Sequence, residues 1–466
     1  MPYSSAAHDT AYRLTDEDLR ALAQHDLAEI HRKRIVKLIF LVYWLVIFNG
    51  ALRKWVLPPF QKEIYFIGDP VVLLIYWLSI RYRFFKHSLI VMTITIAVAW
   101  LCVMEVMYHM GVDQIDLLLT GSGLRSYFLY IPLALLIAET FERADLERLV
   151  RQTLLLAIPI AIISVIQSRS AAGSMINAGI AHEGEFRVTP LSVGEGMLRT
   201  TGTFTSNIGQ GMFVGSIVAM LLWVWTLPAD RRPLKGITLM AVTGAVLANV
   251  AVSGQRTIFV LVILILCTAV IAAVLMKEVG NSWDVLKSCA IIGVIGVFVG
   301  PVLFPAQLHA LSVRSAGSAA NDDPYSFGLV NRALGDFVSF EDYLDSTPLA
   351  GFGIGQTSNA ASMLNRSTVG WSENEWQRHV QELGPIVGLI TIFLRIALVL
   401  WMGGSACVAA RRHDDALALL LFGFIGIVVL YFPVTSQGTV TGYAWIFAGF
   451  CMAANKSPKT GWALRD

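Results

Sequence analysis

Hydrophobic residues along this chain gather in runs of about 20, separated by polar connections. A run of that length, coiled as an α-helix, crosses the hydrocarbon core of a bilayer with its backbone hydrogen bonds satisfied internally. The runs lie at roughly 35–52, 64–80, 88–107, 125–140, 153–168, 207–227, 236–252, 257–276, 286–305, 384–403, 415–433 and 438–454. The pattern predicts an all-α polytopic membrane protein with about twelve transmembrane helices.

Lysine and arginine are concentrated in every second connection between these runs. The basic connections hold Arg32, Lys33, Arg34 and Lys37; Arg81, Arg83 and Lys86; Arg143, Arg148 and Arg151; Arg231, Arg232 and Lys235; Lys277 and Lys287; Arg411 and Arg412; and Lys456, Lys459 and Arg465. Short cytoplasmic loops of membrane proteins are enriched in these two residues. We therefore expect both termini in the cytoplasm and the long connections, 169–206 and 306–383, on the outer face.

These assignments divide the chain into five segments. Residues 1–34 are expected to form an amphipathic cytoplasmic tail, because Thr15 and the acidic residues after it are typical of a helix start. Residues 35–305 would hold the first nine transmembrane helices, and 306–383 a large outer loop before the tenth helix. Residues 384–454 would supply the last three helices, and 455–466 a second cytoplasmic tail.

Composition narrows the class of protein. Hydrophobic residues make up 55% of the chain and charged residues 15%, whereas charged residues make up roughly 25% of a soluble domain. The formal net charge of +2 gives no reason to expect a nucleic-acid partner. The five cysteines lie in apolar runs without metal-type spacing, so we expect free thiols. We expect no metal and no cofactor.

Arginine dominates the positive charge of the predicted outer face beyond its first loop. Its planar guanidinium binds phosphate or carboxylate through two parallel hydrogen bonds, which a lysine ammonium does not do. The candidates for binding an acidic or phosphorylated ligand are Arg199, Arg256, Arg332 and Arg378. The alternative is that these arginines are scattered solubilising charges.

The stretch ENEWQRHVQELGPIVG, residues 373–388, places titratable groups directly before an apolar run. If it is helical, Glu375, Arg378, His379 and Glu382 lie on one face, three or four residues apart. One interpretation is a surface ladder of salt bridges, which contributes little to stability. The other is a partly desolvated cluster that supplies a general base.

Two further features bear on the site. Arg395 lies inside the tenth run and Glu105 inside the third, and the two could pair, either as part of a site or as an anchor of the fold. The glycines at 351, 353 and 355 do not follow a nucleotide-binding pattern and predict a tight turn.

Several short motifs occur in an order that resembles a known superfamily. Arg199, Gly202, Phe204 and Asn207 match an RxxGxFxxxN-like motif before a helix, and SGQR at 253–256 matches an SGSR-like turn. A long loop with an arginine and then GxGxG follow, and Asn374, Glu382, Gly384 and Gly388 match HNxxxxxxxExGxxG. Over roughly 120–400 the chain resembles the O-antigen ligases and Wzy-type polysaccharide polymerases, which are inner-membrane glycosyltransferases with a GT-C-like fold and a large periplasmic loop.

The resemblance implies a function and a set of roles. A glycan would pass from undecaprenyl diphosphate to a sugar hydroxyl on the periplasmic face of the bacterial inner membrane, by a metal-independent, inverting transfer. The family's histidine is Glu373 here, so the catalytic candidates are Glu373, His379 and Glu382, with Glu375 as another neighbouring base.

The expected product and partners follow from the same resemblance. We expect a polymerase of exopolysaccharide or O-antigen repeat units, with an O-antigen ligase acting on a lipid A core as the alternative. A polysaccharide export transporter or scaffold subunit is the alternative of another class. The expected partners are the carrier-linked glycan, membrane lipid, and chain-length regulator and export proteins.

Overall fold

The computed structural model describes residues 16–84, 96–100, 102–104, 106–107, 117–179, 192–194, 197–278, 280, 283–290, 293, 305, 339–358, 361 and 374–456. Among these residues, seven helical segments are long and apolar enough to cross a membrane, and three shorter apolar helices accompany them. The prediction of a helical membrane protein is therefore confirmed at the level of its class. The count of twelve stays a prediction, because the runs at 88–107 and 286–305 are only partly described.

The first half of the chain contains long helices and short turns. Its elements are α1 (Asp16–Ala51), the π-helical turn η1 (Leu52–Val56), the short η2 (Pro58–Phe60) and α2 (Gln61–Tyr65), then α3 (Asp69–Arg81), α5 (Leu117–Phe128), α6 (Ile131–Thr140), α7 (Arg143–Arg169) and η3 (Met175–Asn177). A hairpin of β1 (Ser192–Gly194) and β2 (Met197–Leu198) then pairs antiparallel. The sequence predicted a separate tail at residues 1–34. In the described part of that range there is no such separation, because α1 runs without a break from Asp16 through the first apolar run.

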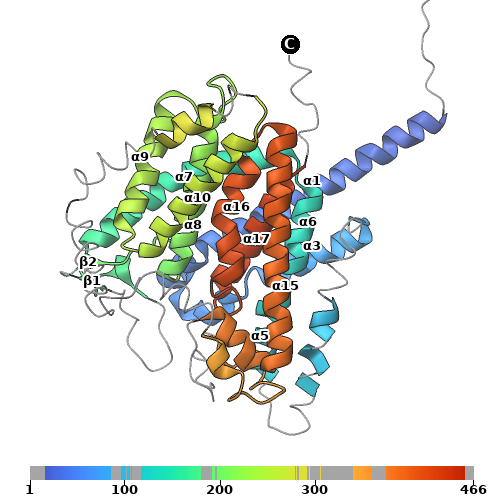
Figure 1. Cartoon of the computed structure of the whole chain (residues 1–466), viewed down its shortest axis with the longest axis vertical. Helices are drawn as coiled ribbons and strands as arrows, with labels where there is room; N and C mark the ends of the chain where they lie inside the picture. The colour runs from blue at the N-terminus through green and yellow to red at the C-terminus, as the bar shows by residue number, and fades with distance from the viewer. Residues whose placement is uncertain are drawn as a thin grey trace, which may run out of the picture.

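The second half supplies the centre of the bundle and its longest helix. Its elements are α8 (Asn207–Thr226), α9 (Gly236–Val252), α10 (Arg256–Leu275), η4 (Glu341–Tyr343), α15 (Glu375–His413), α16 (Leu417–Tyr431) and α17 (Gly438–Ala454). Figure 1 shows α15 running along the bundle beside α16 and α17, with its first turns folded aside at one end.

The core forms around helices that are apolar on every face. α8 is buried along almost its whole length, and it packs against α10, α16 and α17. A helix with no polar face is suited to the interior of a membrane bundle. α17 also packs along α6, and α7 packs along α9, so segments far apart in the sequence enclose the centre.

One end of the bundle gathers connections that the sequence assigns to the cytoplasm. Arg32 donates to the carbonyl oxygen of Thr140 at 2.9 Å and pairs with Asp145 at 2.6 Å. Lys456 donates to the carbonyl oxygen of Glu139 at 2.8 Å. The opposite end gathers the connections predicted on the outer face: Lys54 donates to Thr201, Gln255 to Asn207, and the backbone of Thr435 to Glu375. The grouping of the connections agrees with the prediction, and which end faces the cytoplasm stays a prediction.

Candidate functional site

A break inside α15 creates the site. Gly384 has φ 75° and ψ 169°, which a residue with a side chain rarely adopts, and Pro385 follows it without a backbone N–H. The break separates residues 375–383, here called the outer segment, from the membrane-crossing part of α15. The outer segment folds back against that part, since a Cβ added to Gly388 would lie only 2.6 Å from the carbonyl oxygen of His379.

The ionisable residues of the outer segment are buried. Glu375, Arg378 and His379 are 0% exposed and Glu382 is 1% exposed. These values exclude a surface ladder of salt bridges. Together with Arg395, which is 6% exposed, these four residues are called the α15 cluster below.

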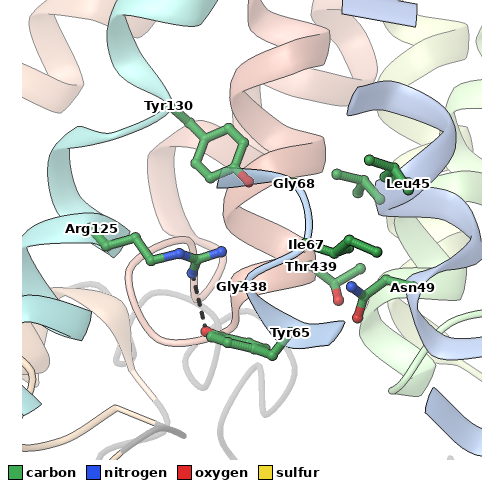
Figure 2. A pocket seen from close by; sticks show the side chains of 10 residues that line it. Leu45, Asn49, Tyr65, Ile67, Gly68, Arg125, Tyr130, Gly438 and Thr439 are labelled. Atoms are coloured by element: carbon green, nitrogen blue, oxygen red, sulfur yellow. Dashed lines mark hydrogen bonds between the residues drawn. The ribbon is translucent and has the colours of Figure 1, made fainter. Parts of the chain in front are cut away.

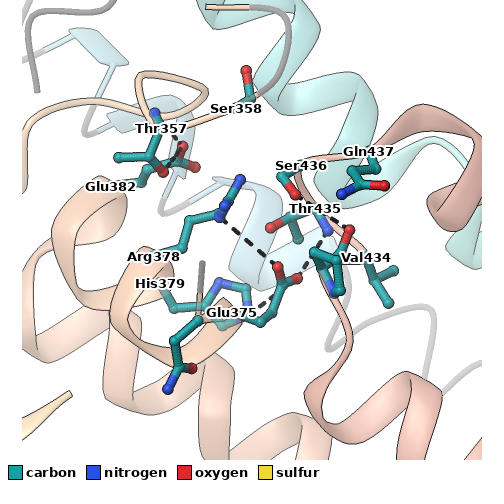
Figure 3. Close-up of polar contacts among 12 residues, drawn as sticks. Thr357, Ser358, Glu375, Arg378, His379, Glu382, Val434, Thr435, Ser436 and Gln437 are labelled. Atoms are coloured by element: carbon teal, nitrogen blue, oxygen red, sulfur yellow. Dashed lines mark hydrogen bonds and ion pairs between the residues drawn. The ribbon is translucent and has the colours of Figure 1, made fainter. Parts of the chain in front are cut away.

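Glu375 is the centre of the α15 cluster. Its Oε1 atom lies 3.0 Å from Nη2 of Arg395 and accepts a 2.8 Å hydrogen bond from the backbone N–H of Thr435. Its carboxylate lies 3.9 Å from Nε of Arg378 and 4.0 Å from Nε2 of His379. Figure 3 shows Glu375 beside Arg378, His379 and the loop that carries Thr435. One carboxylate therefore faces two guanidinium groups and an imidazole in a buried space.

The partner of Arg395 differs from the one suggested by the sequence. The side chain of Glu105 lies outside the described residues, and the ion pair observed for Arg395 is with Glu375. Twenty residues of straight helix would separate these two positions by about 30 Å. Only the break at Gly384 allows the two side chains to meet.

His379 is held from one side of its ring. Its Nδ1 atom lies 3.0 Å from the hydroxyl of Tyr127 on α5, and the two rings meet edge to face. Its Nε2 atom has no hydrogen-bond partner among the residues that the structure describes. In the tautomer whose Nδ1–H donates this hydrogen bond to the tyrosine hydroxyl, Nε2 carries a lone pair that can accept a proton.

Glu382 has a different role from Glu375, because its carboxylate holds the glycine-rich turn through hydrogen bonds. Its Oε1 atom accepts hydrogen bonds from the backbone N–H of Thr357 at 2.8 Å and from the Thr357 hydroxyl at 2.7 Å. The N–H of Gly353 donates to the Glu382 carbonyl, which caps the end of the outer segment. Gly351 and Gly355 have positive φ, so the prediction of a tight turn is confirmed. Gly355 also packs against the backbone of Gly123 on α5.

A largely apolar cavity of about 250 Å³ opens beside the cluster. Its polar lining includes His379, Arg395 and Thr435, and Tyr127 also contributes to its wall. Most of the remaining lining comes from apolar side chains of α5, α15 and α17, such as Phe128, Leu394, Leu398, Trp401 and Trp445. A ligand with an apolar chain and a polar head therefore has a matching space here.

The structure unites some of the predicted site residues and separates others. Arg378, His379 and Glu382 lie together in the α15 cluster. Arg199 is half-buried in the loop between β2 and α8, and no hydrogen bond or ion pair joins it to the cluster within the described part of the chain. Arg256 begins α10, but its side chain is not described, and both Arg332 and Glu373 lie outside the described residues.

The two motifs near Arg199 and Arg256 are connected to each other. Gln255 donates to the carbonyl oxygen of Asn207 at 2.7 Å, which joins the start of α10 to the start of α8. The residue that caps α8 is Ser206, whose hydroxyl accepts from the N–H of Gly209. Asn207 is the first residue of the helix itself.

Sequence reasoning missed the contributions of Tyr127 and Thr435 and the central position of Glu375. Nothing near the first two in sequence marks them, since they reach the site from α5 and from the loop between α16 and α17. The Gly-Pro pair at 384–385 was a usable signal, because this dipeptide is typical of turns.

No family model, curated protein or solved structure matches this chain.

Proposed function

We propose that the protein is a glycosyltransferase of the bacterial inner membrane that acts on glycans linked to a polyprenyl diphosphate. The observation that supports this most is the position of His379 and Arg395 at the polar edge of an apolar cavity. A polyprenyl chain needs an apolar groove at membrane depth, and a diphosphate needs guanidinium groups beside it.

The proposed reaction is a single displacement. Nε2 of His379 accepts the proton of the acceptor hydroxyl while that oxygen forms a bond to the anomeric carbon of the donor sugar. The bond from that carbon to the diphosphate oxygen breaks, and its electron pair leaves with the diphosphate. Displacement from the opposite face inverts the anomeric centre.

The other members of the cluster have supporting roles in this proposal. Arg395 and Arg378 offset the charge that develops on the leaving diphosphate. Glu375 positions both guanidinium groups and stabilises the imidazolium that forms when His379 takes the proton. Glu382 keeps the glycine-rich turn on the outer segment, so we assign it a positioning role. Arg199, Arg256 and Arg332 stay candidates for additional diphosphate contacts, and Glu373 for a second base.

We favour polymerisation of an exopolysaccharide or O-antigen on the periplasmic face, with both termini in the cytoplasm. The carrier-linked glycan is the substrate, and chain-length regulator and export proteins are the expected partners. The alternative product is that of an O-antigen ligase, which passes the glycan to a lipid A core. The two activities share the donor and differ only in the acceptor.

The experiment that tests this function is deletion of the chain followed by gel analysis of the glycan. A polymerase predicts loss of long chains with single repeats retained, and a ligase predicts long chains that no longer reach the lipid A core. Unchanged chain length with lost export would contradict both and would indicate a transporter or scaffold. Changing Arg395 or Arg378 to lysine should impair the activity although the charge is kept, and full activity in both variants would contradict two-point binding of the diphosphate.

A further inference from the structure

Two neighbouring basic residues are buried at the outer end of α1. Arg53 and Lys54 are 2% and 3% exposed, and both belong to the π-helical turn η1. Such turns are rare and often occur at functional sites. Two consecutive buried cations at the end of a membrane helix are costly unless an anion accompanies them.

Lys54 has only neutral hydrogen-bond partners among the described residues. Its ammonium donates to the hydroxyl of Thr201 at 2.9 Å and to the carbonyl oxygen of Gly202 at 3.1 Å. It also lies 4.8 Å from the centre of the Trp55 ring. These contacts fix the ammonium against the loop before α8, and no carboxylate within the described part of the chain pairs with it.

Arg53 has guanidinium N–H groups that find no hydrogen-bond acceptor among the described residues. Its Nε and Nη2 atoms have no hydrogen-bond partner among the described residues, and its guanidinium lies 5.3 Å from the centre of the Tyr65 ring. A ring face attracts a cation, but it cannot accept the directed hydrogen bonds that these two N–H groups offer.

Asp69, a carboxylate near Tyr65, pairs with a third cation, Arg125. Asp69 binds Arg125 through two hydrogen bonds of 2.5 Å and 3.0 Å, and the Arg125 guanidinium also lies 4.7 Å from the centre of the Tyr65 ring. Figure 2 shows Arg125 beside Tyr65, where it donates to the tyrosine hydroxyl. The Tyr65 ring thus lies beside both Arg53 and Arg125. Among the described residues, Arg125 has a carboxylate partner, whereas no ion pair is found for Arg53 or Lys54.

The surroundings indicate at which depth this excess charge lies. Val56, Leu57 and Phe60 follow directly and are 61%, 44% and 53% exposed. Exposed apolar side chains of a membrane protein face lipid, and these three lie at the end of the span, where the hydrocarbon gives way to headgroups and their phosphates. We propose that Arg53 and Lys54 form a binding site for the phosphate group of a membrane lipid, on a different helix from the α15 cluster.

The test uses the full-length protein in neutral detergent with three probes: phosphatidylglycerol, phosphatidylcholine and inorganic phosphate. Phosphatidylglycerol should raise the thermal unfolding temperature of the wild type, and the other two should not. Arg53→Gln should weaken phosphatidylglycerol binding at least about tenfold, the loss of one charged hydrogen bond or more. Lys62→Gln is the matched control, because it removes one positive charge from an exposed position on the neighbouring α2.

A second readout separates a binding role from a structural one. Without lipid, Arg53→Gln should unfold at the same or a higher temperature than the wild type, because it removes a buried charge that no described carboxylate pairs with. A lower unfolding temperature together with an unchanged response to phosphatidylglycerol would overturn the proposal. A wild-type protein whose unfolding temperature responds to none of the three probes would also overturn the proposal. An equal response to inorganic phosphate would overturn the assignment to a lipid and indicate a soluble anion.

Discussion

The substitution Glu375→Gln tests the organisation of the α15 cluster. Glutamine has nearly the shape of glutamate and keeps an oxygen that can accept from the backbone N–H of Thr435. The change therefore removes a charge with little change in packing. It takes away the carboxylate that faces Arg395 at 3.0 Å and Arg378 at 3.9 Å.

The size of the effect follows from burial and distance. At 3.0 Å and an effective dielectric constant of about 20, the attraction between Glu375 and Arg395 amounts to about 5 kcal/mol before desolvation is counted. Breaking a buried ion pair from one side costs about 3–5 kcal/mol, because the remaining charge stays buried. We expect Glu375→Gln to lower the free energy of unfolding by that amount. Arg395→Met should cost less, since Glu375 keeps Arg378 beside it.

A double-mutant cycle measures the coupling between the two residues. Unfolding would be followed by far-UV circular dichroism during titration of detergent micelles with sodium dodecyl sulfate, for the wild type, both single variants and the double variant. The double variant should be more stable than the sum of the single effects predicts, by at least about 2 kcal/mol. Additive effects would refute the reasoning, because they would mean that Glu375 and Arg395 do not interact.

Three further predictions concern the supports of the cluster. Gly384→Ala should lower the free energy of unfolding by about 3 kcal/mol or more, because Gly384 has a positive φ and an added Cβ would overlap the carbonyl oxygen of Leu349. Gly404→Ala is the control, because the position of its added Cβ is open, and the same dodecyl sulfate titration should show no loss of stability. Thr357→Val removes the hydroxyl that donates to Glu382, and it should lower the free energy of local opening of the glycine-rich turn by about 1–2 kcal/mol. Amide hydrogen exchange in the turn should therefore be faster, and unchanged exchange would show that this bond does not hold the turn. Tyr127→Phe should lower turnover about tenfold with little change in KM, and a change in KM alone would argue against a role in orienting the imidazole.

The apolar runs predicted the bounds of a helix correctly where that helix is apolar from end to end. The expected ranges 236–252 and 438–454 match α9 and α17, and 207–227 matches α8 (Asn207–Thr226) within a residue. The prediction was poorer where a helix continues beyond its apolar run: α7 begins at Arg143 instead of 153, and α15 covers 375–413 instead of 384–403. Hydropathy reports the thickness of the hydrocarbon core, while a charged turn outside it can stay helical.

The site was predictable only where its residues share one helix face. Helical spacing alone placed Glu375, Arg378, His379 and Glu382 together, and they are together and buried. The partner of Arg395 was beyond such reasoning. Its position depends on a reversal of the chain at Gly384, which no periodicity encodes.

The central claim is that the imidazole of His379 takes the proton from the hydroxyl of the acceptor sugar. The most direct measurement is the rate of glycan lengthening by purified protein in liposomes that contain a polyprenyl-diphosphate-linked repeat unit. His379→Ala should lower this rate by about 10²–10⁴-fold, the contribution of a general base. His413→Ala, at the far end of the same helix, should leave it unchanged. A His379→Ala protein that lengthens glycans at the wild-type rate would contradict the account.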